Sequence, residues 1–365
     1  MALIKNKRKT LRTKKTKGKK LRKKNIRRKS INKIKRGGAF FEDSLPDDLK
    51  KGEMLGSGAW GKVYIATWNE NSEEKVGVVK VSKSHGESHY KINLHEVEIL
   101  KYLTERENRI TCPSNISIYG YKRYDDKREL EILMEYFSGV ELFELQGRID
   151  FSNEKGKLAW NSIKNQLVNA VNCLHNLNVV HRDIKPENIM ISMKTLDIKM
   201  IDFGFACHKE GEELQKTCDI FVGTRWYISP ELYMFYVNKE MRRLGLRGPY
   251  TEFENITWEM LIAADIWALG MTLYTLAYGK KLFEFYFDKD EMPYSADEIK
   301  RNLLQIGRKE KDITYFISHE LSYKDNIVLF PIILPLLEVD VSKRINNFKT
   351  LVETIQGQRV VVPSQ

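Results

Sequence analysis

The chain has 365 residues, of which 42% are hydrophobic and 11% aromatic, enough apolar material for a sizeable core. Its net charge of +12 is unevenly spread, because residues 1–36 hold 19 of the 61 Lys and Arg residues and none of the 49 Asp and Glu residues. The rest of the chain therefore has 42 basic and 49 acidic residues, which excludes a uniformly basic protein and marks a boundary near residue 37.

The cysteine pattern bears on the compartment. The cysteines are widely spaced and form no C-x-x-C pair, so the sequence indicates neither a zinc site nor a disulfide framework. They are Cys112, Cys173, Cys207 and Cys218. A reducing, intracellular compartment is the simplest interpretation.

Signals for secretion or membrane attachment are not found in the sequence. The N-terminus lacks the apolar stretch of a signal peptide, and Ala2 stands where N-myristoylation needs glycine. The most apolar run, Ile327–Leu337, is short and interrupted by Pro331 and Pro335, which favours a buried C-terminal helical region. We therefore expect no transmembrane segment.

Residues 1–38 form the basic tail, which a linker at 39–52 joins to the rest of the chain. The tail has too little apolar surface to offset the entropy of ordering, so we expect it to be disordered. Residues 5–36 could bind nucleic acid, act as a nuclear localisation signal, attract an anionic surface, or serve only for solubility. No aromatic residue precedes Phe40, so base stacking is not offered and any nucleic-acid contact should be nonspecific.

From Glu53 onward the pattern is that of a folded domain. Short runs rich in Val, Ile and Tyr predict strands, and longer runs with helical periodicity predict helices. The predicted strands lie around Met54 and at Lys62–Thr67, Val76–Ser82 and Leu130–Phe137, and the predicted helices at Ser88–Glu105, Lys155–Leu177 and Trp258–Tyr278. This order predicts an α+β domain at 53–355 with a small β-rich lobe (53–137), a larger mainly helical lobe (138–355) and a C-terminal tail (356–365).

The first chemical motif is a glycine-rich segment between two predicted strands, Gly56-Ser57-Gly58-Ala59-Trp60-Gly61. Glycines at this spacing let backbone N–H groups approach phosphate oxygens without interference from Cβ atoms. A dinucleotide-binding fingerprint would open a helix, whereas here a strand follows. The segment therefore favours a hairpin that covers a nucleotide, although an exposed β-turn would give the same letters.

A lysine and a glutamate are predicted to meet in the small lobe. Strand alternation places Lys80 on one face with Val76 and Val78, where an unpaired charge is costly. In the next predicted helix, Glu96 shares a stripe with Ile99 at helical spacing, so its carboxylate faces the apolar side. An ion pair between Lys80 and Glu96 would satisfy both charges, but an edge lysine and a rim glutamate are the alternative.

The most specific stretch is His181-Arg182-Asp183-Ile184-Lys185-Pro186-Glu187-Asn188, followed by Ile201-Asp202-Phe203-Gly204. Phosphoryl transfer requires a carboxylate that accepts the proton of the attacking hydroxyl, oxygen ligands for Mg²⁺, and a cation for the γ-phosphate. The side chains that fit these needs are Asp183 as the base, Asp202 and Asn188 as Mg²⁺ ligands, and Lys185 as the cation.

With these motifs the sequence resembles the eukaryotic-type Ser/Thr protein kinases over roughly residues 53–350. The resemblance implies a bilobal kinase-like fold and a catalytic set of Asp183, Lys185, Lys80 and Glu96, with Asn188 and Asp202 as Mg²⁺ ligands. It also implies the ATP-binding residues Gly56, Gly58, Gly61, Val63, Val78, Lys80, Met134 (the gatekeeper), Glu135, Phe137 and Met190. Every position whose loss defines a pseudokinase is filled, so we expect an active enzyme.

The resemblance further assigns structural positions. Ser229-Pro230-Glu231 is similar to the family's A-P-E motif, with Arg344 as the partner of Glu231. Asp265 falls in the family's central helix and is expected to bond the backbone of the catalytic loop. Lys185 and Thr224 are typical of Ser/Thr kinases, in which the threonine bonds the base and the lysine.

Two features depart from the family pattern. The usual phosphosite region has no hydroxyl at the commonest position, so Thr217 is a displaced candidate and Asp219 an electrostatic substitute; we expect partial activity without phosphorylation. The segment 232–259 is about twenty residues longer than the family norm and contains a basic stretch at 238–249.

The predicted function is an ATP- and Mg²⁺-dependent transfer of phosphate to Ser or Thr hydroxyls of a protein substrate. The alternative is a kinase-fold scaffold of weak activity that its basic tail recruits to nucleic acid or an anionic surface. The expected location is intracellular, in the cytoplasm or nucleus, and Lys-, Ile- and Asn-rich usage would also suit a large DNA virus, with a host-cell or virion location.

Overall fold

The computed structural model describes residues 43–58, 61–210, 218, 222–243, 245, 254–280 and 330–357, all within the unit Phe40–Gln365. The basic tail at 1–38 and the two regulatory candidates Thr217 and Asp219 lie outside the described residues. The same holds for residues 358–365. The predictions made for these segments therefore remain predictions.

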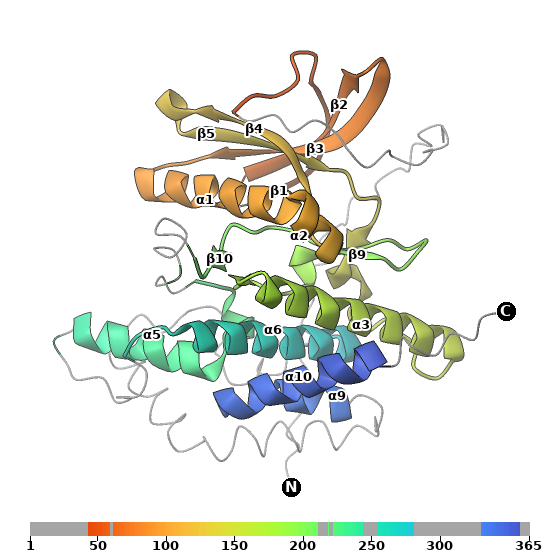
Figure 1. Cartoon of the computed structure of the whole chain (residues 1–365), viewed down its shortest axis with the longest axis vertical. Coiled ribbons are helices and arrows are strands. Elements are labelled where there is room, and N and C mark those ends of the chain that lie inside the picture. The colour runs from red at the N-terminus through yellow and green to blue at the C-terminus, as the bar shows by residue number, and fades with distance from the viewer. Residues whose placement is uncertain are drawn as a thin grey trace, which may run out of the picture. The chain divides into compact units, whose positions relative to one another are not determined.

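Five antiparallel strands form one sheet in the order β1-β2-β3-β5-β4 (Figure 1). Their bounds are Lys50–Gly58 (β1), Gly61–Glu70 (β2), Glu73–Lys83 (β3), Ile118–Tyr124 (β4) and Glu129–Glu135 (β5). Asn71 and Ser72 join β2 to β3 with positive φ at both positions, which matches the twist of a two-residue hairpin. The four predicted strands correspond to β1, β2, β3 and β5.

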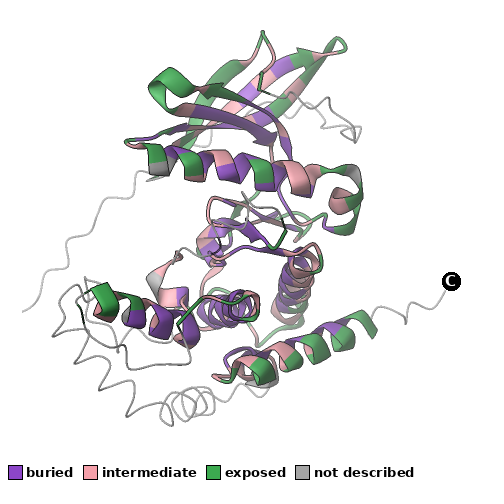
Figure 2. Ribbon diagram, turned by 60° about the vertical axis from the view of Figure 1, so that its left-hand side comes forward, coloured by how far each residue is buried: buried purple, intermediate pink, exposed green. Residues whose placement is uncertain are grey.

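The two faces of the sheet have different partners. Val79, Leu133 and Ala66 are fully buried on one face, where Leu45 and Leu49 pack against them. Because neighbouring residues of a strand point to opposite faces, Lys80 lies on the other face. That second face is covered by helix α1 (Figure 2).

Helix α1 spans Glu87–Thr104 and α2 spans Arg106–Thr111. The prediction of Ser88–Glu105 is therefore confirmed to within one residue at each end. Glu105 has φ −50° and ψ 142°, which interrupts the helical path, and the short α2 beyond it was not predicted. Figure 2 shows buried and exposed residues alternating along α1, as expected of a helix with one face on a core.

The second lobe is mainly helical. Its helices are α3 (Glu154–Asn176), α5 (Pro230–Arg243), α6 (Trp258–Tyr278), α9 (Phe330–Leu336) and α10 (Val341–Gly357). Asn153 caps α3 by accepting a hydrogen bond from the Gly156 N–H at 2.8 Å, and Thr257 caps α6 by accepting one from Met260 N at 3.2 Å. The predicted helices at 155–177 and 258–278 are therefore confirmed, the second with the same bounds.

Helix α6 is the centre of this lobe. By length and mean hydropathy (1.5) it could cross a membrane, and 89% of that stretch is buried inside the unit. A core helix passes the same test, so this is weak evidence for a span. The run Ile327–Leu337, which the sequence analysis predicted to be a buried helical region, contains helix α9 (Phe330–Leu336) in its described part, and Ile333 and Leu336 are fully buried.

The remaining elements are short strands and 3₁₀ helices. The strands are β6 (Val140–Glu141), β7 (Val179–Val180), β8 (Ile189–Ile191), β9 (Ile198–Met200) and β10 (Cys207–His208). The 3₁₀ helices are Asp125–Lys127, Leu142–Leu145, Pro186–Asn188 and Arg225–Tyr227. Because β8 follows the catalytic loop and β9 precedes Asp202, the β8–β9 pairing brings these two segments together.

The segment 113–117, which leads into β4, is fastened to β9. Ile116 N donates to Met200 O at 3.0 Å, and Met200 N donates to Ser114 O at 2.7 Å. Lys199 Nζ donates to Pro113 O at 2.8 Å. The small lobe thus contacts the large lobe through main-chain hydrogen bonds, two residues before Asp202.

The structure corrects the cysteine prediction. It pairs Cys112 with Cys173 and Cys207 with Cys218 as disulfides, with Cα–Cα distances of 5.7 and 5.6 Å. The first joins the end of α2 to α3 across 61 residues of sequence. Sequence spacing did not reveal the pairs, because a disulfide depends on distance in space.

The long segment between Glu231 and Asp265 starts as helix α5 (Pro230–Arg243). In its later part, Glu254 Oε1 lies 3.5 Å from Arg242 Nη2. The beginning of the predicted insertion is therefore helical, and two of its basic residues are paired, Arg242 with Glu254 and Arg243 with Glu240.

Candidate active site

Three charged side chains meet beneath the sheet. Lys80 Nζ lies 2.7 Å from both carboxylate oxygens of Glu96 and 3.3 Å from Asp202 Oδ1. Lys80 and Glu96 are buried, at 8% and 2% exposure. The predicted ion pair is present, and it holds α1 against β3.

Burial would lower the pKa of Lys80, but the carboxylates of Glu96 and Asp202 outweigh it and raise that pKa. Burial would likewise raise the pKa of Asp202, but Lys80, with smaller contributions from His181 and Lys185, lowers it. Lys80 is therefore cationic and Asp202 ionised at neutral pH.

Three of the residues predicted to contact adenine lie on the same face of the sheet as Lys80. Val63 lies opposite Lys80 in the β2–β3 register, and Val78 lies opposite Met134 in the β3–β5 register. Opposed residues share a face, so these apolar side chains lie on the same side as the Lys80 ammonium group. Met190 lies on β8, in another sheet, and its predicted contact with adenine stays a prediction.

The glycine-rich hairpin has open space where side chains would stand. A Cβ atom added to Gly56 or Gly58 would meet nothing within 4 Å, so the protein's own packing does not demand glycine there. Gly61 has φ +133°, and its added Cβ would clash with Val81 O. The conformation demands glycine only at Gly61, and the open side of the other two leaves room for phosphate groups.

The segment after Met134 is the predicted hinge. β5 ends at Glu135, whose N–H donates to Ser117 O at 2.9 Å and whose carboxylate lies 3.1 Å from Lys199 Nζ. Phe137 is partly buried against the main core. The start of the hinge is thus fixed at Glu135 by a backbone hydrogen bond and an ion pair.

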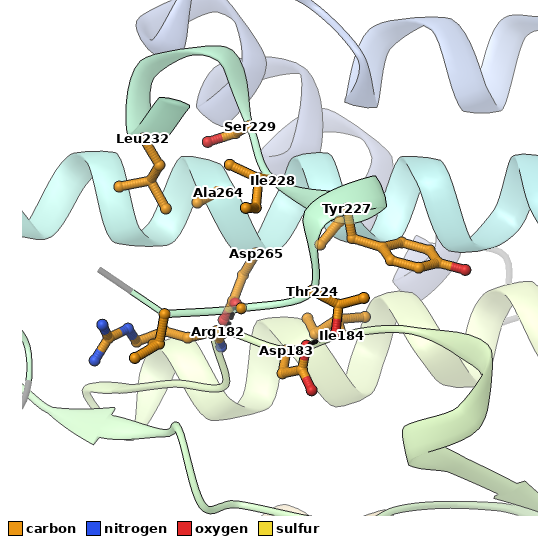
Figure 3. A pocket seen from close by; sticks show the side chains of 13 residues that line it. Arg182, Asp183, Ile184, Thr224, Tyr227, Ile228, Ser229, Leu232, Ala264 and Asp265 are labelled. Carbon is orange, nitrogen blue, oxygen red and sulfur yellow. Dashed lines mark hydrogen bonds between the residues drawn. The ribbon is translucent and has the colours of Figure 1, made fainter. Parts of the chain in front are cut away.

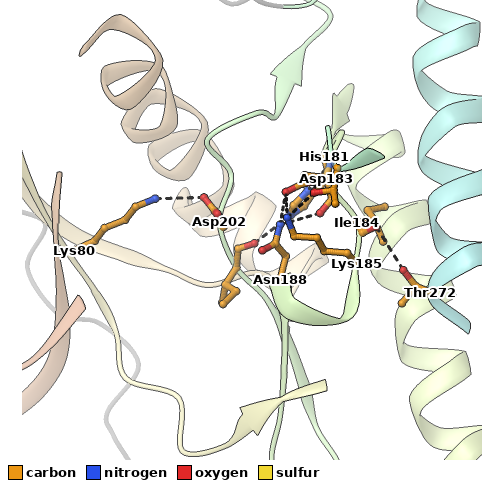
Figure 4. Close-up of polar contacts among 10 residues, drawn as sticks. Lys80, His181, Asp183, Ile184, Lys185, Asn188, Asp202 and Thr272 are labelled. Atoms are coloured by element: carbon orange, nitrogen blue, oxygen red, sulfur yellow. Dashed lines mark hydrogen bonds and ion pairs between the residues drawn. The ribbon is translucent and has the colours of Figure 1, made fainter. Parts of the chain in front are cut away.

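The carboxylate of Asp183 is the centre of a hydrogen-bond network (Figure 4). Thr224 Oγ1 donates to its Oδ1 at 2.6 Å, and its Oδ2 accepts from Lys185 Nζ at 2.6 Å and Asn188 Nδ2 at 2.8 Å. Lys185 Nζ also donates to Thr224 Oγ1 at 2.7 Å. The predicted contacts of Thr224 with the base and the lysine are confirmed.

Asp265 holds the catalytic loop from below, as predicted. Its two carboxylate oxygens each accept a backbone N–H at 2.8 Å, one from His181 and one from Arg182. Figure 3 shows Asp265 beside Arg182. His175 Nε2 lies 3.2 Å from the same carboxylate. Arg182 has φ 66°, a conformation that a non-glycine residue rarely adopts, and the Asp265 clamp stabilises it.

A small cavity of about 20 Å³, room for one water molecule, lies between the catalytic loop and the segment before α5 (Figure 3). Arg182, Asp183, Thr224 and Asp265 contribute to its lining. Lys80 does not, so this cavity is separate from the predicted nucleotide site.

Asn188 and Asp202 fit the requirements of a magnesium site. Asn188 uses its Nδ2 for Asp183, which leaves its Oδ1 for another partner. Ile201 N donates to Asn188 O at 2.9 Å, so Asp202 follows directly beside Asn188. Mg²⁺ prefers one or two protein oxygens with phosphate and water oxygens completing its shell. Among the described residues, no group of three or more His, Cys, Asp or Glu side chains that could hold a metal ion is found.

Glu231 and Arg344 form the predicted buried ion pair. Arg344 Nη1 and Nη2 lie 2.7 and 3.1 Å from the two carboxylate oxygens of Glu231, at 0% and 2% exposure. Arg344 also donates to Ala263 O and stacks over Trp267. The pair fastens the start of α5 to α10, and with it the end of the segment that carries Thr224.

A contact of α1 that the sequence analysis missed involves His95. His95 Nε2 lies 2.9 Å from Ala206 O, and the ring is buried at 8% exposure. The residue stands next to Glu96 on α1, and Ala206 follows the Asp202-Phe203-Gly204 motif. A polar side chain beside Glu96 was the available signal, but its partner is 111 residues away.

Replacing His95 with Gln is expected to remove one pH dependence of stability. Burial, reinforced by Arg182 and opposed by Ala206 O and Glu98, lowers the pKa of His95 below 6.5. The native state then binds fewer protons than the unfolded state, so the contribution of His95 is full above pH 6.5 and is lost as the pH falls through 6.5 towards the lower native pKa. Denaturant unfolding between about pH 7.5 and pH 5.5 measures it.

At each pH, the free energy of unfolding of His95→Gln is subtracted from that of the parent chain. This difference should shrink as the pH falls. A difference that stays constant with pH would contradict the expectation.

Replacing Lys80 with Met is expected to lower phosphate transfer by about 10²–10³-fold, because a fixed cation beside the nucleotide phosphates is lost. Initial rates of transfer from ATP measure the effect. The control is Lys83→Met, an exposed lysine of the same strand, which should keep the parent rate. Equal rates for the two variants would show that Lys80 does not act on the phosphates.

The comparisons with known proteins agree with this geometry. The model of the protein kinase domain matches residues 49–354. An Aurora kinase of Eremothecium gossypii is 30% identical over 285 residues, which are 76% of this chain and 64% of that protein. Calcium-dependent protein kinase 22 of Arabidopsis thaliana is 30% identical over 65% of this chain and 43% of its own length. NUAK family SNF1-like kinase 1 of Mus musculus is 33% identical over 65% of this chain and 31% of its own length.

The chain thus spans less than two thirds of the length of each of these relatives. The family model, in contrast, matches most of the chain and includes every residue of the site described above. The chain belongs to the eukaryotic-type Ser/Thr protein kinase family.

Proposed function

We propose that the protein transfers the γ-phosphate of ATP to Ser or Thr hydroxyls of a protein substrate, with Mg²⁺. The observation that carries this proposal is the hydrogen-bond network around Asp183, in which one carboxylate accepts bonds from Thr224, Lys185 and Asn188. Phosphoryl transfer depends on such placed charges more than on covalent chemistry.

The residues divide the work as follows. Lys80, held by Glu96, positions the ATP phosphates, and the glycine-rich hairpin covers them. Asp183 accepts the proton of the attacking hydroxyl, and Lys185 neutralises charge on the transferred phosphate.

Asn188 and Asp202 would hold Mg²⁺, which when bound shields the negative charge of the phosphates. Val63, Val78 and Met134 would contact adenine, together with Met190 and the backbone at Glu135 and Phe137.

The experiment is transfer of labelled phosphate from ATP to peptide mixtures that contain Ser, Thr or Tyr as the only hydroxyl residue. Label on Ser and Thr peptides that disappears with a magnesium chelator supports the proposal. Asp202→Asn should lose transfer as well, because the metal would be mispositioned. Near-normal transfer by Asp202→Asn would contradict the metal assignment.

The alternative of a weakly active scaffold gives a different pattern in the same assay. A scaffold would show little transfer and would bind its target equally well with Asp183→Asn.

We further propose that residues 5–36 bind nucleic acid or an anionic surface nonspecifically, and that the protein is intracellular. Binding to mixed-sequence DNA should fall steeply with salt and vanish when residues 1–38 are removed.

A further inference from the structure

Strand β10, which follows the Asp202-Phe203-Gly204 motif, pairs with β7, the strand that precedes the catalytic loop. Cys207 starts β10 and lies opposite Val180 of β7, and Val180 directly precedes His181. Cys207 is fully buried. Cys207 is therefore held close to both motifs: it follows Asp202 by five residues in sequence, and it pairs with the residue before the catalytic loop.

Its disulfide partner, Cys218, lies further along the segment that ends at α5. Cys218 is 6% exposed and packs in an apolar cluster with Leu232 and Phe235 of α5 and Met260 of α6. The disulfide therefore fixes this segment to the core of the large lobe. The point of attachment lies in sequence after the Asp202 motif and before Thr224.

The part that follows Cys218 reaches the active site. Thr224 lies six residues later and donates to Asp183, while Tyr227 N donates to Thr224 O at 2.9 Å. Glu231, at the far end, is held by Arg344. The segment with Thr224 is thus anchored by an ion pair on one side and by a disulfide on the other.

We propose that the Cys207–Cys218 disulfide is a redox-controlled modification that orders the segment bearing Thr224, so that the oxidised chain is the more active kinase. The effect on activity rests on the proposed function. Phosphorylation can order such a segment through new charge interactions, and a covalent link can order it directly. This chain lacks a hydroxyl at the commonest phosphosite, so the disulfide would take the place of the phosphate.

The chemistry needs a disulfide donor, for which oxidised glutathione serves. One thiolate of the pair attacks the donor disulfide and releases one glutathione thiol; the second thiolate then attacks the mixed disulfide and releases the other. The bond formed joins Cys207 to Cys218, the donor's S–S bond breaks, and the two protons lost by the cysteines go to the two released thiols. The reverse sequence, with two glutathione thiols, reduces the pair.

The size of the effect follows from the loop that the bond closes. The two cysteines are 11 residues apart in sequence. In the chain-entropy model, a cross-link over a loop of this length favours the ordered state by about 100-fold. The ratio of activities in the two redox states is bounded by that factor.

The experiment uses the full chain equilibrated in oxidised or reduced glutathione buffers. Differential alkylation and mass spectrometry identify the paired cysteines, and hydrogen exchange reports the order of residues 222–227. Transfer of phosphate from ATP is measured in the same samples. The expected result is slower exchange at 222–227 and faster phosphate transfer in the oxidised form.

Two matched variants separate the disulfides. Cys112→Ser/Cys173→Ser loses the other disulfide, which lies outside the segment, and should keep the redox response. Cys207→Ser/Cys218→Ser should lose the response and behave like the reduced chain in both buffers. The parent chain in the two buffers tests the proposal without any substitution, should this variant fold poorly.

Equal exchange at 222–227 in the oxidised and reduced parent chain would overturn the proposal. So would a redox response that persists without Cys207 and Cys218. If no form transfers phosphate while exchange still depends on the disulfide, then the proposed kinase activity fails and the ordering by the cross-link stands.

Discussion

Asp183→Asn is expected to lower the rate of phosphate transfer by about 10²–10⁴-fold, because an amide cannot accept the proton of the attacking hydroxyl. The substitution keeps the size of the side chain, and Thr224 Oγ1 can still donate to the remaining oxygen. Nucleotide binding, which we propose depends on Lys80 and the glycine-rich hairpin, should change little. Initial rates of transfer and titration with ATP measure the two quantities separately.

The matched control is Asp197→Asn, an exposed aspartate in the turn between β8 and β9. It should keep the parent rate. A residual rate of Asp183→Asn within tenfold of the parent would show that another group accepts the proton. Loss of ATP binding together with transfer would point to a disturbed site instead.

Arg344→Leu is expected to destabilise the protein by about 3–5 kcal/mol, because Glu231 would keep a buried charge without its partner. The side chains of Arg344 and Glu231 are 0% and 2% exposed, so solvent cannot compensate. Urea unfolding measures the free energy of unfolding. The reason for the large effect is the removal of one partner only.

Two variants test that explanation. Glu231→Gln/Arg344→Leu removes the stranded charge and should recover part of the loss. Arg243→Leu breaks an exposed pair with Glu240 and should cost no more than about 1 kcal/mol. A loss in Arg344→Leu as small as that in Arg243→Leu would mean that the buried pair contributes little.

Much of the fold follows from local sequence. Helix α6 was predicted with its observed bounds, and local signals stand at both ends: Thr257 caps its start and Gly279, with φ 70°, follows its end. Strand β4 was not predicted, since Gly120 and a register shift beside it break the alternation that identifies a strand.

The contacts predicted for the site depended on motifs, which name residues that are far apart in sequence. The meeting of Lys80 with Glu96 also followed from an electrostatic argument, because both had to be buried. The His95–Ala206 contact and the two disulfides had neither a motif nor a charge that required a partner. They depend on which distant segments the fold brings together, and short-range sequence patterns do not predict such contacts.

The attachment of segment 113–117 to β9 has a mechanical consequence. Met200 both accepts from Ile116 and donates to Ser114, and it stands two residues before Asp202. A displacement of segment 113–117 would therefore be passed through these two hydrogen bonds to β9 and on to Asp202. We expect any movement of the small lobe to change the position of the carboxylate that we propose as a metal ligand.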